Sequence, residues 1–288
     1  MRKFNFLAAI AIAMSVLFVA CEQNEDSVVL ADEVSEATLQ ALINAGFDVD
    51  NIAPIPFDDG VLVEGDIYIP FHDLASLKEG NRLPIEEQYS TTNLVATSGN
   101  RVITVYAPVA SSGGGRGKKS SGGYSTAMIA GLDLAISRYN AENLTISFQR
   151  VTSSTGADIV MTRLAKGDER RGILGSAGFP TSSGDPYGEI KMSGVLESSY
   201  GLSVGGIATI IGHEMGHCVG FRHTDFFDRS ISCGGGTSNE GTAGVGANHI
   251  PGTPTGASLS DASWMLACSD GSDRPFNNDD QTALDYLY

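Results

Sequence analysis

The chain has 288 residues, a formal net charge of −16 and four cysteines. This length is enough for one large hydrophobic core, or for one core and a small appended segment. The acidic excess argues against a nucleic-acid partner, because such a surface repels the phosphate backbone. The excess is uneven: Lys78 and Arg82 are the only basic residues between positions 22 and 89, so an acidic N-terminal region precedes a more balanced remainder.

The N-terminus is typical of an export signal. A basic start, MRK, is followed by an apolar run over residues 6–20, which is too short and wrongly flanked for a membrane span. Small Ala20 precedes Cys21, as at the lipidation site of bacterial lipoproteins, although Phe18 is unusual three residues before that cysteine. We expect residues 1–20 to be a lipoprotein signal peptide and Cys21 to carry the lipid. The alternative is a plain signal peptide that is cut elsewhere.

The acidic region contains one clear structural pattern. Residues 22–37 are polar and acidic, as expected of a solvated tether. The stretch VLVEGDIYI, residues 61–69, alternates apolar and polar residues around Gly65 and predicts a strand with a bend. Residues 81–97 have no strong period and are expected to be a linker.

The rest of the chain alternates predicted strands and helices. Residues 111–124 are glycine-rich and basic, but they lack the first glycine and the final Ser or Thr of a phosphate-binding loop, so a flexible exposed loop is predicted. Asn278 or Asp279 is placed to cap the last helix. In chain order, the predicted elements are strand 101–108, helix 125–140, strands 144–151, 157–164 and 188–192, helix 207–219 and a closing helix 279–288.

One disulfide is expected among the cysteines that follow Cys21, because an exported protein meets oxidising conditions. Cys218 lies in the predicted helix 207–219, where a bridge would disturb the geometry, and is expected to be a small buried thiol. Cys233 and Cys268 both lie in loop-like sequence. These two are therefore predicted to pair.

Three of the five histidines lie in GHEMGHCVGFRHTD, residues 212–225. Residues four apart share one face of a helix, so His213 and His217 can bind one metal ion. Glu214, next to the first of them, can take a proton from a metal-bound water. Gly220 can adopt a positive φ, end the helix and turn the chain back, which brings His223 to the same ion.

Three histidine ligands leave a fourth position open, which is typical of a catalytic rather than a structural zinc. The alternative is that the histidines are ordinary core residues, but this leaves the separate roles of the HExxHxxGxxH positions unexplained. His72 and His249 lie outside the pattern and are assigned no role. Asp225 lies four residues before Arg229, and an ion pair between them is preferred to a metal role for Asp225.

The chain resembles the metzincin zinc peptidases. Their extended motif is matched here by His213, Glu214, His217, Gly220 and His223. That clan also carries a methionine in a tight turn beneath the zinc, and Met265 in SWMLAC is placed to form this Met-turn. An ordinary core methionine is the alternative. The sequence HEMGHCVGFRHTD is most similar to the bacterial dual-action HEIGH metallopeptidases, with Met215 where they have isoleucine.

The resemblance implies an α+β fold with a twisted mixed sheet, a backing helix, an active-site zinc helix and a loop-rich C-terminal subdomain. It implies a catalytic domain over residues 97–288, preceded by an acidic tether and prosegment over residues 21–96. It also implies one catalytic Zn²⁺ and a peptide substrate that lies as an added strand along residues 175–179. In astacins a tyrosine two residues after the turn methionine touches the metal, but Ala267 stands there in this chain.

The expected function is an exported, zinc-dependent endopeptidase that hydrolyses peptide bonds with Glu214 as general base. It would act on proteins or peptides as a monomer and contact a membrane only through a lipid anchor. The expected location is the outer membrane or cell surface of a bacterium, or the medium after release. The alternative is a non-catalytic zinc-containing surface binding module, against which Glu214 argues, because a binding module needs no general base.

The prosegment suggests how such an enzyme is kept inactive. Matrixins block their zinc with a prosegment cysteine, but the chain has no cysteine between Cys21 and Cys218. Residues 61–69 resemble the astacin prosegment motif, in which an aspartate after glycine caps the zinc, and Asp66 is the matching aspartate. Our hypothesis is that Asp66 binds the zinc until a cut between residues 81 and 100 releases activity. The alternative is a hairpin edge with a solvated Asp66, since Val63 replaces the phenylalanine of the motif.

Overall fold

A computed structural model describes residues 33–77, 88–110, 123–241, 245–254, 256–259 and 262–288. The predicted signal peptide, the lipidation site Cys21, most of the tether, part of the linker and most of the glycine-rich loop lie outside the described residues. Residues 34–288 form one compact unit. Within the part of the chain that is described, every helix is too short or too polar to cross a membrane.

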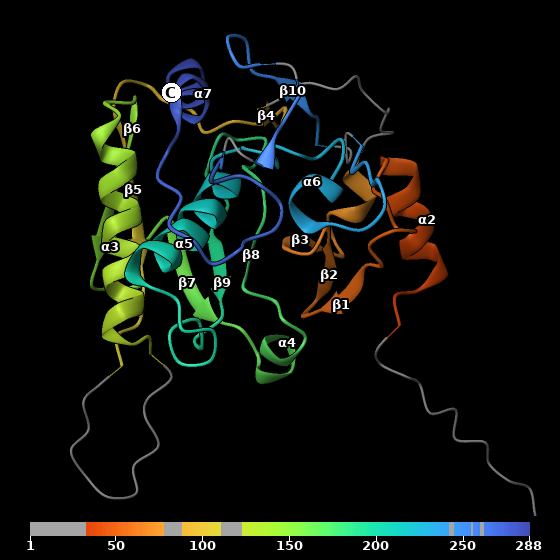
Figure 1. The fold of residues 1–288 in the computed structure, drawn as a ribbon, viewed down its shortest axis with the longest axis horizontal. Coiled ribbons are helices and arrows are strands. Elements are labelled where there is room, and N and C mark those ends of the chain that lie inside the picture. The colour runs from red at the N-terminus through yellow and green to blue at the C-terminus, as the bar shows by residue number, and fades with distance from the viewer. Residues whose placement is uncertain (1–32, 78–87, 111–122, 242–244, 255, 260–261) are drawn as a thin grey trace, which may run out of the picture. The chain divides into compact units, whose positions relative to one another are not determined.

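The fold is built on an eight-stranded mixed sheet with the order β1-β2-β3-β8-β9-β7-β5-β6 (Figure 1). Strands β6, β5, β7 and β9 run parallel, β8 is antiparallel to β9, and β3 is parallel to β8. A second, two-stranded sheet pairs β4 (Tyr89–Ser90) with β10 (Asn248–His249). The strands of the large sheet are β1 (Ile55–Phe57), β2 (Gly60–Val63), β3 (Ile67–Pro70), β5 (Arg101–Tyr106), β6 (Ile146–Val151), β7 (Ile159–Arg163), β8 (Gly175–Ala177) and β9 (Glu189–Met192).

Two long helices pack against each other and against this sheet. The first, α3 (Thr126–Ala141), begins at Ser125, whose side chain accepts a hydrogen bond from the backbone N–H of Met128. The second, α5 (Val204–Cys218), is buried along nearly its whole length and carries the metal-binding motif. The other helices are α2 (Glu36–Ala45), the 3₁₀ helix η1 (Leu74–Ser76), α4 (Lys166–Arg170), α6 (Ser230–Cys233) and α7 (Asn278–Leu287).

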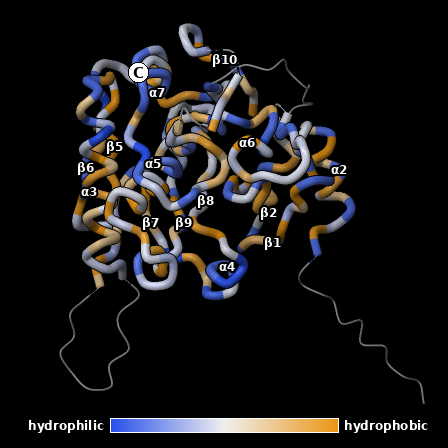
Figure 2. The backbone as a smooth tube through the Cα atoms, in the orientation of Figure 1, coloured by the Kyte–Doolittle hydropathy of each residue, from blue (hydrophilic) through white to orange (hydrophobic). Residues whose placement is uncertain are grey.

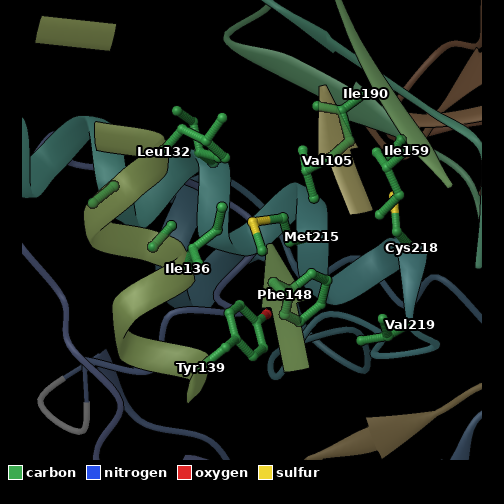
Figure 3. Packing of buried hydrophobic residues seen from close by; sticks show 14 of the residues in the cluster. Val105, Leu132, Ile136, Tyr139, Phe148, Ile159, Ile190, Met215, Cys218 and Val219 are labelled. Atoms are coloured by element: carbon green, nitrogen blue, oxygen red, sulfur yellow. The ribbon is translucent and has the colours of Figure 1, made fainter. Parts of the chain in front are cut away.

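The main hydrophobic core lies between α3, α5 and the parallel strands (Figure 3). Tyr139 of α3 packs on Phe148 of β6 with 4.9 Å between the ring centroids, and its hydroxyl donates to the backbone carbonyl of Gly212 at 2.8 Å. Met215, inside the histidine motif, is fully buried in the same core. In contrast, α4 is hydrophilic and buries no residue (Figure 2). The α+β fold with a mixed sheet, a backing helix and a buried helix that carries the histidine motif is therefore confirmed.

The close contact of the two helices depends on Gly131 of α3. A Cβ atom there would lie 2.4 Å from Cγ2 of Ile207 on α5. We expect Gly131→Ala to lower the free energy of unfolding by about 1–2 kcal/mol, because overpacking outweighs the gain in helix propensity. Gly167 of α4 is the matched control, since a Cβ there meets nothing within 4 Å. Urea unfolding should show Gly167→Ala unchanged or stabilised; equal effects at both sites would contradict this packing argument.

The N-terminal region is more structured than the sequence suggested. Residues 36–45 form α2, which buries Leu42 completely, and the predicted bent strand 61–69 is two antiparallel strands, β2 and β3. The turn between them contains Glu64 and Gly65, with φ values of 53° and 92°. Strands β1 to β3 extend the large sheet, so the segment expected to be a prosegment packs on the rest of the fold.

Two local predictions were wrong. Within residues 81–97, the described part from position 88 onwards is not a loose linker, since Tyr89 and Val95 are buried and β4 pairs with β10. The closing helix is capped by Asn277 rather than by Asn278 or Asp279. Asn277 and Asp280 form a reciprocal capping box, in which each side chain accepts from the backbone N–H of the other residue.

Candidate metal centre

The histidine motif lies at the end of α5. His213 and His217 face each other across one helical turn, and their Nε2 atoms are 3.0 Å apart. Gly220 follows the helix with φ of 104°, and a Cβ atom there would lie 2.8 Å from Cδ2 of Leu94. A side chain at this position would therefore be both strained and blocked. The reversal delivers His223 to the other two histidines, as the motif predicted.

A carboxylate completes the group. Asp66, in the turn before β3, places Oδ2 3.2 Å from Nε2 of His223 and 3.4 Å from Nε2 of His213. One ligand atom from each of Asp66, His213, His217 and His223 lies within 4.8 Å of all the others. The Asp66 side chain is only 14% exposed. The alternative of a solvated Asp66 on a hairpin edge is therefore wrong, although the hairpin itself is present.

Each of the three histidines donates a hydrogen bond through its outer ring nitrogen. Each Nδ1 atom faces an oxygen acceptor and therefore carries a proton, so the three Nε2 atoms are turned towards one another and towards Asp66. Three imidazoles and one carboxylate that converge in this way are a donor set that suits a zinc ion, which would take the Nε2 lone pairs. The acceptors are the carbonyl of Trp264 for His213 (2.9 Å), that of Phe221 for His217 (2.8 Å) and Oε1 of Glu240 for His223 (2.8 Å).

Glu214 lies beside this group and is 2% exposed. Its Oε2 atom has no hydrogen-bond partner among the described residues. Burial, followed by the charge of Asp66, raises the pKa of Glu214 well above its ordinary value. Gly175 of β8 makes room for this carboxylate, because a Cβ atom there would lie 2.3 Å from Oε1 of Glu214. Glu214 is thus a buried carboxylate with an unpaired oxygen next to the histidines.

Met265 lies in a turn that packs under α5. A Cβ atom on Gly216 would come within 2.6 Å of its Sδ, so the small residue between the two helix histidines permits the contact. The backbone N–H of Thr224, next to His223, donates to the Met265 carbonyl at 2.8 Å. Met265 therefore lies against the helix that carries His213 and His217 and is bonded to the residue after His223.

No sequence pattern indicated what holds the turn around Met265. Asp280 of α7 is fully buried and accepts from Ser263 Oγ at 2.7 Å and from Gln88 Nε2 at 2.6 Å. Burial raises the pKa of Asp280 to about 6. No role was predicted for Asp280; its side chain both takes part in the helix cap and holds the turn.

The structure joins Cys233 and Cys268 by a disulfide, with 5.1 Å between their Cα atoms, and leaves Cys218 as a buried free thiol. The predicted ion pair between Asp225 and Arg229 was wrong. Asp225 accepts instead from Ser232 Oγ at 2.6 Å and from the backbone N–H of Ala267 at 2.8 Å, next to the disulfide. Arg229 pairs with Glu240. Of the two remaining histidines, His72 lies beside Asp73 and His249 beside Tyr89.

A cavity of about 570 Å³ opens beside His213 and Glu214. Its walls are mainly apolar. They come from the hairpin of β2 and β3, which we call the N-terminal hairpin, and from the loop after the Met-turn. Its lining includes Leu62, Asp66, Ile210, Glu214, Leu266 and Arg274. Space for a ligand therefore lies beside Glu214.

A family model described as dual-action HEIGH metallo-peptidase matches residues 61–288. The chain belongs to this family. The membership that the motif predicted is thus confirmed, and it makes this HEIGH metallopeptidase a zinc-dependent enzyme that cleaves peptide bonds. The match begins at Val61, so the hairpin that carries Asp66 lies inside the matched region of the HEIGH metallopeptidase.

Other comparisons add little. A solved structure described as "GM1 bound form of the ECX AB5 holotoxin" is similar to this HEIGH metallopeptidase with 16% identity and a TM-score of 0.30. The similarity covers 51% of this chain and 65% of that chain, so it spans less than two thirds of that structure's chain. No curated protein matches the sequence.

Proposed function

We propose that the protein is an exported zinc endopeptidase that is made in an inactive form and acts on proteins or peptides. The observation that carries the proposal is the convergence of the Nε2 atoms of three histidines next to Glu214, a buried carboxylate with an unpaired oxygen. A module that only bound zinc would have no use for that second carboxylate. The adjoining cavity provides room for a substrate chain.

A bound zinc ion would polarise a peptide carbonyl and lower the pKa of a nearby water. The ion would be held by His213, His217 and His223. Glu214 would accept the proton of the attacking water on its unpaired oxygen. The same carboxyl group then returns the proton to the leaving amine.

The proposed substrate position is the free side of β8. Without β1 to β3, this strand would be the edge of the sheet, and an extended peptide could add to it. In the structure β3 occupies the place, with Ile67 paired to Ala177 and the Ala177 backbone N–H donating to the Asp66 carbonyl at 3.1 Å. The N-terminal hairpin would therefore exclude substrate from β8 and place a carboxylate among the three histidines.

We further propose that a cut between residues 81 and 100 allows this hairpin to leave. Contacts that hold the hairpin include one residue pair with β8, the Asp66 contacts and the buried pair of Glu64 with Arg222 at 3.1 Å. Leu62 and Tyr68 also pack in a hydrophobic cluster with Leu164 and Ile173, so the hairpin must give up buried apolar contacts when it leaves. The lipoprotein signal 1–20 and the lipidated Cys21 are proposed to place the enzyme at the outer membrane or cell surface of a bacterium. Incorporation of labelled palmitate that is lost in Cys21→Ala tests the anchor; equal labelling would exclude it.

The function is tested by measuring zinc and hydrolysis together. The cut chain should contain one equivalent of zinc and cleave casein at internal bonds. A strong chelator should remove both zinc and activity, and added Zn²⁺ should restore both. Zinc content without hydrolysis in the cut chain would favour the surface binding module instead.

The assignment of His213, His217 and His223 as zinc ligands can be tested by substitution. His213→Ala or His223→Ala should lose the bound zinc, because two histidines hold the ion far more weakly than three. Each variant should also unfold at a lower temperature than the zinc-loaded wild type, since zinc binding to the native state contributes folding free energy. His249→Ala is the control and should retain the metal. One equivalent of zinc in either ligand variant would refute the assignment.

A further inference from the structure

The third histidine has a partner that no pattern in the sequence indicated. His223 is completely buried, and its Nδ1 atom lies 2.8 Å from Oε1 and 3.1 Å from Oε2 of Glu240. Glu240 is itself fully buried, 17 residues after the histidine in a loop. The other two metal-facing histidines donate to neutral backbone carbonyls. A charged acceptor is therefore specific to His223 among the three.

Two arginines hold this carboxylate in place. Arg229 donates from Nη1 to Oε1 of Glu240, and Arg222 donates from Nη2 to Oε2 at 3.4 Å. Arg222 is completely buried and also bonds to the carbonyls of Gly241 and Gly246. The backbone N–H of Glu240 donates to the Phe226 carbonyl at 2.8 Å. The carboxylate is thus fixed from several sides and cannot swing to the metal position.

The contacts determine which ring nitrogen carries the proton. Arg229 Nη1 lies 3.3 Å from His223 Nδ1, because both converge on the same oxygen of Glu240. An arginine cannot accept a hydrogen bond, and an ionised carboxylate cannot donate one. Nδ1 must therefore donate to Glu240, which leaves Nε2 free to face Asp66 and the histidines of α5.

We propose that Glu240 is a positioning residue for the third metal ligand, a role that rests on the proposed zinc function. It holds the His223 ring with Nε2 towards the ion, and its charge makes the imidazole a stronger electron donor. It also offsets the charge of Arg229, whereas Arg222 is paired with Glu64 as well. Loss of the charge should therefore weaken zinc binding even where the ring stays in place.

The test compares zinc affinity by competition with a chromophoric chelator in the full-length chain. Glu240→Gln keeps an acceptor for Nδ1 but removes the charge, and should bind zinc about tenfold more weakly than wild type, within the range for such outer partners. Asp225→Asn is the matched control, because this equally buried carboxylate bonds to Ser232 and Ala267 rather than to a histidine. Its folded fraction should bind zinc like the wild type.

Affinity within about twofold of wild type in Glu240→Gln, or an equal loss in the control, would overturn the role of Glu240. If Glu240→Gln does not fold, a measurement on the wild-type protein still tests the proposal. In the zinc-loaded protein with ¹⁵N-labelled histidine, the His223 ring should show a slowly exchanging proton on Nδ1 and a metal-shifted Nε2. A metal-shifted Nδ1 would contradict the proposal. Neither the zinc affinity nor the state of the His223 ring is measured by hydrolysis. The role of Glu240 in zinc binding can therefore be supported even if the cut wild type does not hydrolyse peptides.

Discussion

Full-length Asp66→Ala is expected to hydrolyse a short peptide without any processing cut. In the wild type the Asp66 carboxylate lies 3.2 Å from His223 and 3.4 Å from His213, where an attacking water must enter. If the intact chain is open in about one molecule in a hundred, removal of the block raises the rate roughly 100-fold. The rate of cleavage of a fluorogenic peptide, normalised to bound zinc, measures the effect.

The control for this variant loosens the hairpin without touching the histidines. Asp59 accepts a hydrogen bond from the Tyr68 hydroxyl at the far end of the same strands. Asp59→Ala should therefore leave the intact chain inactive. If Asp66→Ala stays as inactive as the uncut wild type, the carboxylate is not the block. If both variants are equally active, general loosening rather than metal blocking explains the release.

Glu214→Gln is the second change with a large expected effect, and it is best made in the Asp66→Ala background. The amide cannot take the proton of the attacking water, so the rate of hydrolysis should fall by about 10²–10⁴-fold. Zinc content should remain at one equivalent, because Glu214 is not one of the four converging groups. The matched Glu197→Gln, at an exposed position, should retain full activity. Retained hydrolysis in Glu214→Gln would remove the proposed general base.

The sequence predicted the parts of the fold that have a regular period. Helices α3 and α5 and strands β5, β6, β7 and β9 lie where the apolar spacing placed them, because each must bury one face against the others. Helix α2 was missed: it has only ten residues, and no helix was predicted within the acidic N-terminal region that contains it. Strand β1 was missed because it has only three residues.

Some residues of the metal centre could be predicted from the sequence and others could not. Residues whose spacing has a mechanical purpose, such as His213, His217 and Gly220, could be read from the motif. Glu240 and Asp280 could not, because each acts through a side chain that reaches its partner only after distant segments fold together. The ion pair expected between Asp225 and Arg229 failed for a related reason: the spacing rule applies to helices, and here a loop and a disulfide determine the partners.

The central claim is a zinc peptidase that its own N-terminal hairpin keeps inactive. The most direct measurement compares the intact wild-type chain with the same chain cut between residues 81 and 100, each analysed for zinc and for peptide hydrolysis. We expect one equivalent of zinc in both and hydrolysis only after the cut. Full activity in the intact chain, or none in the zinc-loaded cut chain, would contradict it.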